Sequence, residues 1–148
     1  PTIVTFAKAD ENLEILLAAL TRPDLTTDFP SILSTGADTS PAPFTVFAPT
    51  NDAFIALIQE LGANSLSDID EPTLKSTLTY HVIAETVAAS SDLSDNLQLE
   101  TLGGTITANV TGGATLTDGN NRVSNIIAVD IQADNGVIHV IDKVILPN

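Results

Sequence analysis

The two histidines, His81 and His139, are the side chains of this sequence best suited to proton transfer or to binding a transition metal. Neither is joined to a carboxylate by an H-E-x-x-H run or by another ligand spacing, so no zinc site is expected. Both stand among branched apolar residues, such as Val82 and Val140. That setting favours a buried His81 whose ring is satisfied by backbone groups, and a core or edge position for His139.

Nucleophilic catalysis has no signature in this sequence. There is no cysteine and no G-x-S-x-G elbow, and the serines cluster in expected loops. The pairs Gly103-Gly104 and Gly112-Gly113 lack the lysine and the strand–helix context of a phosphate-binding loop, and they predict hairpin turns instead. We therefore predict that the chain is not an enzyme and needs no cofactor. A hydrolase is the remote alternative.

Three loops are rich in carboxylate and amide oxygens, the ligands that Ca²⁺ prefers. None has the spacing of an EF-hand, and Asp and Asn are also common turn residues, so turn hydrogen bonds are the preferred interpretation and no metal site is predicted. Asn51 and Asp52 follow Thr50 at an expected helix start, where capping and the helix dipole account for both residue types. The loops contain Asp68, Asp70 and Glu71; Asp92 and Asp95; and Asp118, Asn120 and Asn121.

The charge balance is strongly acidic. With 19 Asp and Glu against 5 Lys and Arg, the formal net charge is −14. Such a surface repels a phosphate backbone, so no nucleic-acid partner is predicted. Hydrophobic residues make up 43% of the 148 positions, which is enough for one domain over residues 1–148 with its own core. The longest apolar runs fall far short of the ~20 residues of a membrane span, so no membrane insertion is expected.

Helical spacing dominates the first half of the chain and short strands dominate the second. This order indicates an α+β fold rather than alternating βαβ units. Helices are expected over 2–9 and 10–20, after the cap Thr50 with an apolar face of Phe54, Leu57, Ile58 and Leu61, and from Pro72 onward. Strands are expected over 44–48, 97–101, 105–110, 114–117, 126–131 and 137–146.

Three runs, in this order, carry a resemblance to a known family. They are FTVFAPTNDAF at residues 44–54, LTYHVI at 78–83 and NGVIHVIDKVILP at 135–147. Together they resemble the two signature segments and the tyrosine–histidine motif of the fasciclin domain, and they cover nearly the whole chain. The resemblance implies a wedge of two roughly orthogonal β-sheets with several helices packed alongside, most helices N-terminal and most strands C-terminal.

The resemblance also implies candidate partner-binding residues. In animal members of the family, a Tyr-His motif with branched apolar neighbours is implicated in integrin-mediated adhesion, and Tyr80 and His81 match it. Some members carry an adhesive motif of Glu-Pro-Asp-Ile-Met type before the last strand, of which Asp130 and Ile131 alone are present here. The structural alternative is a buried His81 with backbone partners and an exposed Asp130 at an ordinary strand end.

By this resemblance, the chain is expected to be a secreted or surface-displayed module that binds a cell-surface or matrix protein without catalysis. A start at Pro1 and the absence of Met fit either an artificially trimmed chain or a mature form whose signal segment has been removed. Two alternatives stay open. Some family members of photosynthetic organisms bind carotenoids, so the chain could carry a lipophilic small molecule, and it could also self-associate.

Overall fold

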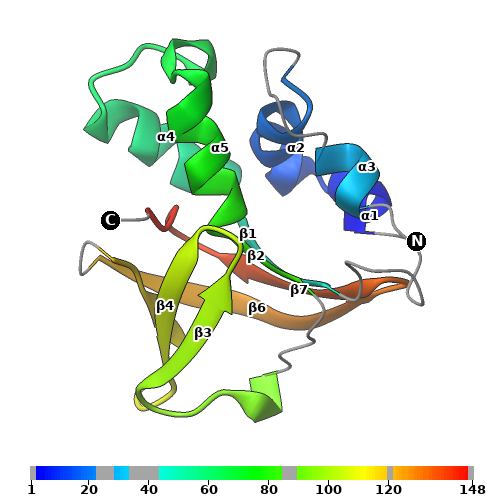
Figure 1. The fold of residues 1–148 in the computed structure, drawn as a ribbon, viewed down its shortest axis with the longest axis vertical. Helices are drawn as coiled ribbons and strands as arrows, with labels where there is room; N and C mark the ends of the chain where they lie inside the picture. Colours follow the sequence, from blue (N-terminus) through cyan, green and yellow to red (C-terminus); the bar gives the residue numbers. More distant parts are fainter. Residues whose placement is uncertain (1–2, 23–28, 34–43, 85–89, 120–121, 147–148) are drawn as a thin grey trace.

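The computed structural model describes residues 3–22, 29–33, 44–84, 90–119 and 122–146. In Figure 1 the helices gather on one side of a β-sheet. Thr2 of the expected first helix lies outside the described residues, as do Asn120 and Asn121 of the third oxygen-rich loop. The helices are α1 Ile3–Ala9, α2 Glu14–Leu20, α3 Phe29–Leu33, α4 Asn51–Glu60 and α5 Glu71–Thr79, with 3-10 turns at Glu11–Leu13, Leu66–Asp68 and Ser90–Asp92.

Seven strands form one hydrogen-bonded sheet in the order β2-β1-β7-β6-β5-β4-β3. Strands β1 and β7 pair in parallel, and every other neighbouring pair in this order is antiparallel. The strands are β1 Phe44–Pro49, β2 Val82–Ala84, β3 Leu97–Thr101, β4 Gly104–Asn109, β5 Thr115–Thr117, β6 Val123–Ala133 and β7 Gly136–Ile141. The predicted α+β class is confirmed, with β1 as the one strand that precedes α4.

Strand β6 joins the two parts of the expected wedge. Its first residues pair with β5, and the stretch from Ile126 to Ala133 pairs with β7. Two register shifts on the β7 side mark bulges, which bend a strand and increase its twist. In Figure 1, β3 and β4 consequently run steeply across the direction of β6 and β7. The Leu102 N–H donates to the Val82 carbonyl at 2.9 Å, so the two edge strands of the folded sheet meet.

Strand β1 is buried on both faces, because it separates two cores. Phe44, Val46 and Ala48 belong to the cluster between the sheet and the helices. Phe47 points to the opposite face and joins the second cluster, between the two halves of the sheet, together with Tyr80. The period-2 pattern of the β1 sequence thus assigns its side chains to two different cores.

The predicted cap of α4 is confirmed: the Thr50 hydroxyl oxygen accepts the Ala53 N–H at 3.3 Å. Asn51 ties this helix start to the start of α2, since its Oδ1 accepts the Ile15 N–H at 2.9 Å and its Nδ2 donates to the Glu11 carbonyl at 2.8 Å. The predicted apolar face is wrong at its last member. Leu61 is 47% exposed, because the helix ends there.

The last strand is shorter than predicted. Strand β7 ends at Ile141, where its partner β6 passes from β7 to β5. The chain then bends, and Asp142 accepts the Asn125 N–H at 2.8 Å. Val144 and Ile145 are each 1% exposed, and they enter the helix-side and sheet-side cores respectively. An apolar run over residues 137–146 therefore reflects burial in two different conformations.

Candidate interaction site

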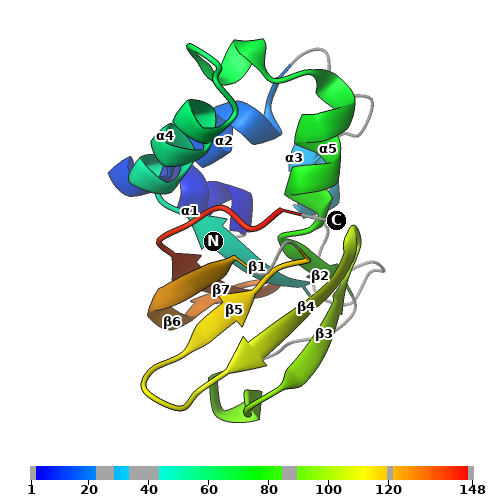
Figure 2. The same cartoon turned by 90° about the vertical axis from the view of Figure 1, so that its left-hand side faces the viewer.

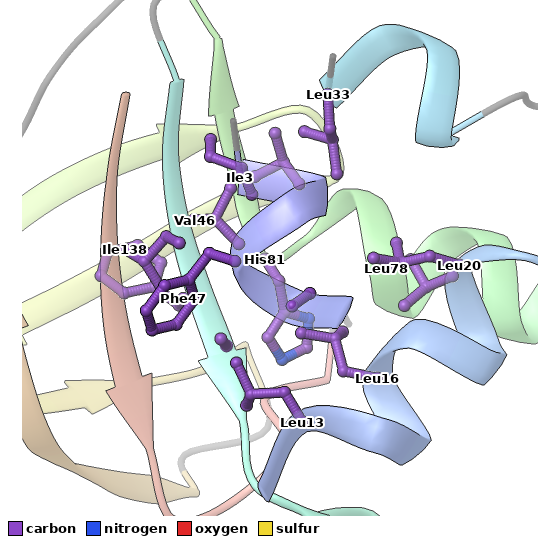
Figure 3. A pocket seen from close by; sticks show the side chains of 14 residues that line it. Ile3, Leu13, Leu16, Leu20, Leu33, Val46, Phe47, Leu78, His81 and Ile138 are labelled. Carbon is purple, nitrogen blue, oxygen red and sulfur yellow. The ribbon is translucent and has the colours of Figure 1, made fainter. Parts of the chain in front are cut away.

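His81 follows α5 directly and is buried, with 2% of its surface exposed. In Figure 3 its ring points into the space between the helices and β1. The ring Nδ1 lies 2.6 Å from the Thr77 carbonyl oxygen, and Nε2 lies 3.2 Å from the Ile145 backbone nitrogen. A carbonyl only accepts and a backbone N–H only donates, so this bonding pattern assigns a neutral ring with its proton on Nδ1.

Burial lowers the pKa of His81 from 6.5 to about 4, and the Thr77 carbonyl and the Asp118 charge oppose this shift more weakly. Between these two pH values the unfolded chain binds a proton that the folded chain does not. The free energy of unfolding is therefore expected to fall by about 3 kcal/mol as the pH is lowered through this window, and the contribution is complete above it. Below the window the contribution of His81 no longer changes with pH.

Urea denaturation of the wild type and of His81→Gln at a series of pH values measures this effect. Glutamine does not titrate, so the difference between the two proteins removes the contribution of the carboxylates that both share. The wild type should lose stability more steeply than the variant as the pH falls. Parallel curves would contradict a buried neutral imidazole.

Tyr80 is also a core residue, with 1% of its surface exposed. Its hydroxyl donates to the Thr105 carbonyl at 2.6 Å and accepts the Gly119 N–H at 2.9 Å. Burial raises the pKa of Tyr80, the Gly119 N–H opposes that rise, and the Asp118 charge adds a smaller increase. The side chain thus ties the end of α5 to β4 and to the turn after β5. The partner-binding role of Tyr80 and His81 stays a prediction, and both rings are packed away from solvent.

Asp130 and Ile131 lie inside β6 at a bulge, and the expected exposed strand end is wrong. Asp130 is half-buried and has a positive φ of 56°, which few residues other than Gly, Asn and Asp adopt. Its N–H donates to Nδ1 of His139 at 3.2 Å. Ile131 is partly buried against the helix-side core.

Phe47 connects the two candidate pairs. Its N–H donates to the His81 carbonyl at 2.9 Å, and its ring stacks on that of His139, with the ring centroids 5.7 Å apart. His139 has no exposed surface, as predicted for a core histidine. The backbone of His81 and the bulge at Asp130 are therefore linked through the interior of the protein.

Carboxylates of two acidic loops accept hydrogen bonds from groups that lie far away along the chain. Asp95 accepts the N–H groups of Val110 and Thr111 and the Thr111 hydroxyl, and these bonds, the hydroxyl foremost, lower the pKa of Asp95. Asp118 is buried and accepts the Leu146 N–H at 2.9 Å. Within the described residues, no three His, Asp or Glu side chains come close enough to hold a metal ion.

An apolar cavity lies between the helices and β1 and has a volume of about 20 Å³. Figure 3 shows Leu13, Leu16 and Leu78 around it, with His81 at its side. This volume is close to that of a single water-sized probe. Pockets that take drug-sized ligands have volumes of roughly 300 to 1,000 Å³.

The sequence reasoning missed the outer face of β6. Val123, Ile127 and Val129 are 52%, 56% and 42% exposed. In the structure these side chains alternate with less exposed residues, whereas the sequence of the expected strand indicated no solvent-facing side. This row ends directly beside Asp130 and Ile131.

Comparison with known proteins agrees with the described fold. The family profile of the Fasciclin domain matches residues 11–147. The chain is 36% identical over 151 residues to protein sll1483 of Synechocystis, covering 99% of this chain and 73% of that protein. It is 31% identical to human periostin over 150 residues, covering 99% of this chain and 16% of periostin. A solved domain pair from the insect cell adhesion molecule Fasciclin I superimposes with a TM-score of 0.74 at 19% identity, covering 98% of this chain and 50% of that one.

Proposed function

This chain belongs to the fasciclin domain family, and on that premise we propose that it is an extracellular or cell-surface interaction module that binds a protein or matrix partner without catalysing a reaction. The observation that carries this proposal is that both histidines are buried, whereas apolar side chains are exposed on β6. Both ring nitrogens of His81 are occupied by backbone groups, and His139 is fully buried, so neither imidazole is placed to serve a substrate. Strand β6, by contrast, exposes branched apolar side chains to solvent.

The comparisons also support a role as an interaction module. One solved structure that shares this fold is a domain pair from an insect cell adhesion molecule. No helix in the described part of the chain is both long enough and apolar enough to cross a bilayer. We infer a secreted or surface location and a cell-surface or matrix protein as the partner. Residues 1–148 form the single module that binds it.

Of the four candidate residues, Asp130 is half-buried and directly follows Val129 of the exposed row of β6, so we assign it to the contact surface. Ile131 packs against the helix-side core, and we assign it to holding this part of β6 in place. Tyr80 and His81 are buried, and we assign them a positioning role at the end of α5. Tyr80 holds β4 and the turn after β5, and His81 holds the backbone at Ile145. In this proposal the partner contacts the surface of the domain, and the hydrogen bonds of the buried Tyr80 and His81 keep that surface in position.

The alternatives have less support. A carotenoid carrier needs a predominantly apolar pocket of at least several hundred Å³. The apolar cavity between the helices and β1 measures about 20 Å³, and the larger groove beside Ile127, of about 400 Å³, has five polar residues in its lining. Self-association brings together two copies that each carry a net charge of −14, which repel one another. A hydrolase needs a nucleophile beside an available base, and His81 is already bonded through both ring nitrogens.

The test is adhesion of cells or matrix-coated beads to surfaces that carry this domain. Saturable adhesion above an uncoated control is expected, and Asp130→Asn should reduce it by roughly threefold through the loss of one charge contact. Asparagine tolerates the positive φ at this position, so the variant should fold, which circular dichroism verifies. Asp134→Asn, in the exposed turn after β6, is the matched control. Adhesion no greater than on the uncoated surface would overturn the proposal.

A further inference from the structure

One row of exposed side chains distinguishes β6 from the rest of the described surface. Seven large hydrophobic side chains are exposed among the described residues, and three of them are on this strand: Val123, Ile127 and Val129. Residues two apart on a strand share a face and lie about 7 Å apart. A solvent-facing strand usually carries polar side chains on its outer side. A row of exposed branched apolar side chains is typical of a contact surface.

Ile127 also lines a groove of about 400 Å³. The groove lies where the start of α4, the turn before α2 and the chain after β7 approach β6, and Figure 2 shows the segment after β7 passing between α4 and β6. Its volume is within the range of pockets that take small-molecule ligands, roughly 300 to 1,000 Å³. The residues that line it are Asn12, Thr50, Asn51, Asp52, Ile127 and Asp142.

The groove is negatively charged. Asp52 and Asp142 are exposed carboxylates, and the described lining contains no Lys or Arg. The N-terminus of α4 contributes a partial charge of about +0.5, which two full carboxylate charges outweigh. The Asp142 carboxylate is held in place by the Asn125 N–H at 2.8 Å and by the Asn125 side-chain amide at 3.1 Å. The groove therefore presents a fixed negative charge beside an apolar side chain.

We propose that this groove and the β6 row together bind an extended protein segment that carries Lys or Arg beside branched apolar side chains. The apolar side chains pack on Ile127 and Val129, and the cationic groups lie against Asp52 and Asp142. This inference rests on the proposed function and names the chemistry of the partner. A second copy of the chain, a nucleic acid and an anionic lipid surface all carry the wrong charge for this face.

The probe is a capped heptapeptide, Lys-Ser-Val-Ser-Val-Ser-Lys, whose odd-numbered side chains share one face when it is extended. Titrated into the isotope-labelled domain, it should produce saturable amide shifts around Ile127 and at the start of α4. Two control peptides replace both Lys by Glu or both Val by Ser, and each should bind more weakly. Absence of saturable shifts, shifts confined to another face, or equal binding of the Glu peptide would overturn the inference.

Matched variants locate the contact. Ile127→Ser should weaken peptide binding roughly tenfold, and Asp52→Asn should weaken it by about two- to fivefold. Leu102→Ser and Glu100→Gln make the same kinds of change on exposed residues of the β3–β4 hairpin, and they should leave binding unchanged. If the groove variants and the hairpin variants weakened peptide binding equally, the contact would lie elsewhere and the inference would be overturned.

The adhesion assay separates this inference from the proposed function. Adhesion that persists unchanged in Ile127→Ser and Asp52→Asn is consistent with the proposed function and overturns the inference that the partner binds in the groove. Peptide binding at the groove without any adhesion supports the groove and overturns the adhesive role. Loss of adhesion in these two variants, but not in the two hairpin variants, supports both.

Discussion

Gly136→Ala is expected to destabilise this domain by about 4 kcal/mol or more, a loss at the upper end for single substitutions. Gly136 begins β7 opposite Phe44 of β1. A Cβ at this position would lie 2.1 Å from the Phe44 carbonyl oxygen and 2.9 Å from its backbone carbon and nitrogen. These atoms belong to a strand buried on both faces, so they have no room to move as a flexible side chain would. The two central strands would have to separate at this pair.

The turn that precedes β7 also anchors other elements of the fold, so the loss of stability should extend beyond the pair of β1 and β7. The Phe44 N–H donates to the Asn135 carbonyl at 2.9 Å. The Asn135 side chain, without exposed surface, accepts the Ile3 N–H at 3.2 Å and donates to the Leu33 carbonyl at 2.6 Å. Displacement of β7 from β1 therefore also disturbs the attachment of α1 and α3 to the sheet.

Urea or thermal denaturation of Gly136→Ala and Gly62→Ala measures the prediction. Gly62 has a positive φ of 70°, and a methyl group added there would meet no other atom within 4 Å, so its replacement tests the cost of backbone conformation alone. That cost is about 1 kcal/mol. Similar small losses in both variants would show that β1 and β7 tolerate a methyl group between them.

The features that the sequence predicted correctly depend on neighbours along the chain. The Thr50 hydroxyl bonds to the N–H of a residue three positions later, and the alternation in β1 requires nothing beyond the period of a strand. The burial of His139 followed from its apolar neighbours in the same strand. Local chemistry was sufficient for each of these.

The features that sequence reasoning missed depend on pairing between distant segments. The bulge at Asp130 is stabilised by His139 on the neighbouring strand, and the pattern of β6 alone does not reveal it. The end of β7 at Ile141 is set by the place where β6 exchanges partners. For the same reason, the exposure of Ile127 and the groove beside it became visible only once α4 and the chain after β7 were placed around β6.

Phe47→Ala is the second large effect, with an expected loss of about 3–5 kcal/mol in the free energy of unfolding. The Phe47 ring has no exposed surface and belongs to the core between the two halves of the sheet. It also stacks on His139 with an interplanar angle of 25°. Alanine removes both contributions and leaves a cavity between packed strands, because the β1 backbone is held by pairing on both sides and cannot collapse into the space.

Phe47→Leu is the matched control, because it keeps most of the buried volume and loses the aromatic stacking. Its expected loss is about 1–1.5 kcal/mol. Losses below that range in both variants would contradict a packed ring at this position. The Asp130 amide resonance supplies a second measurement, since its N–H bonds to the imidazole on which Phe47 stacks. A shift of that resonance in both variants would mean that the stacked pair positions the β6 bulge, whereas a stability loss without a shift would confine Phe47 to packing.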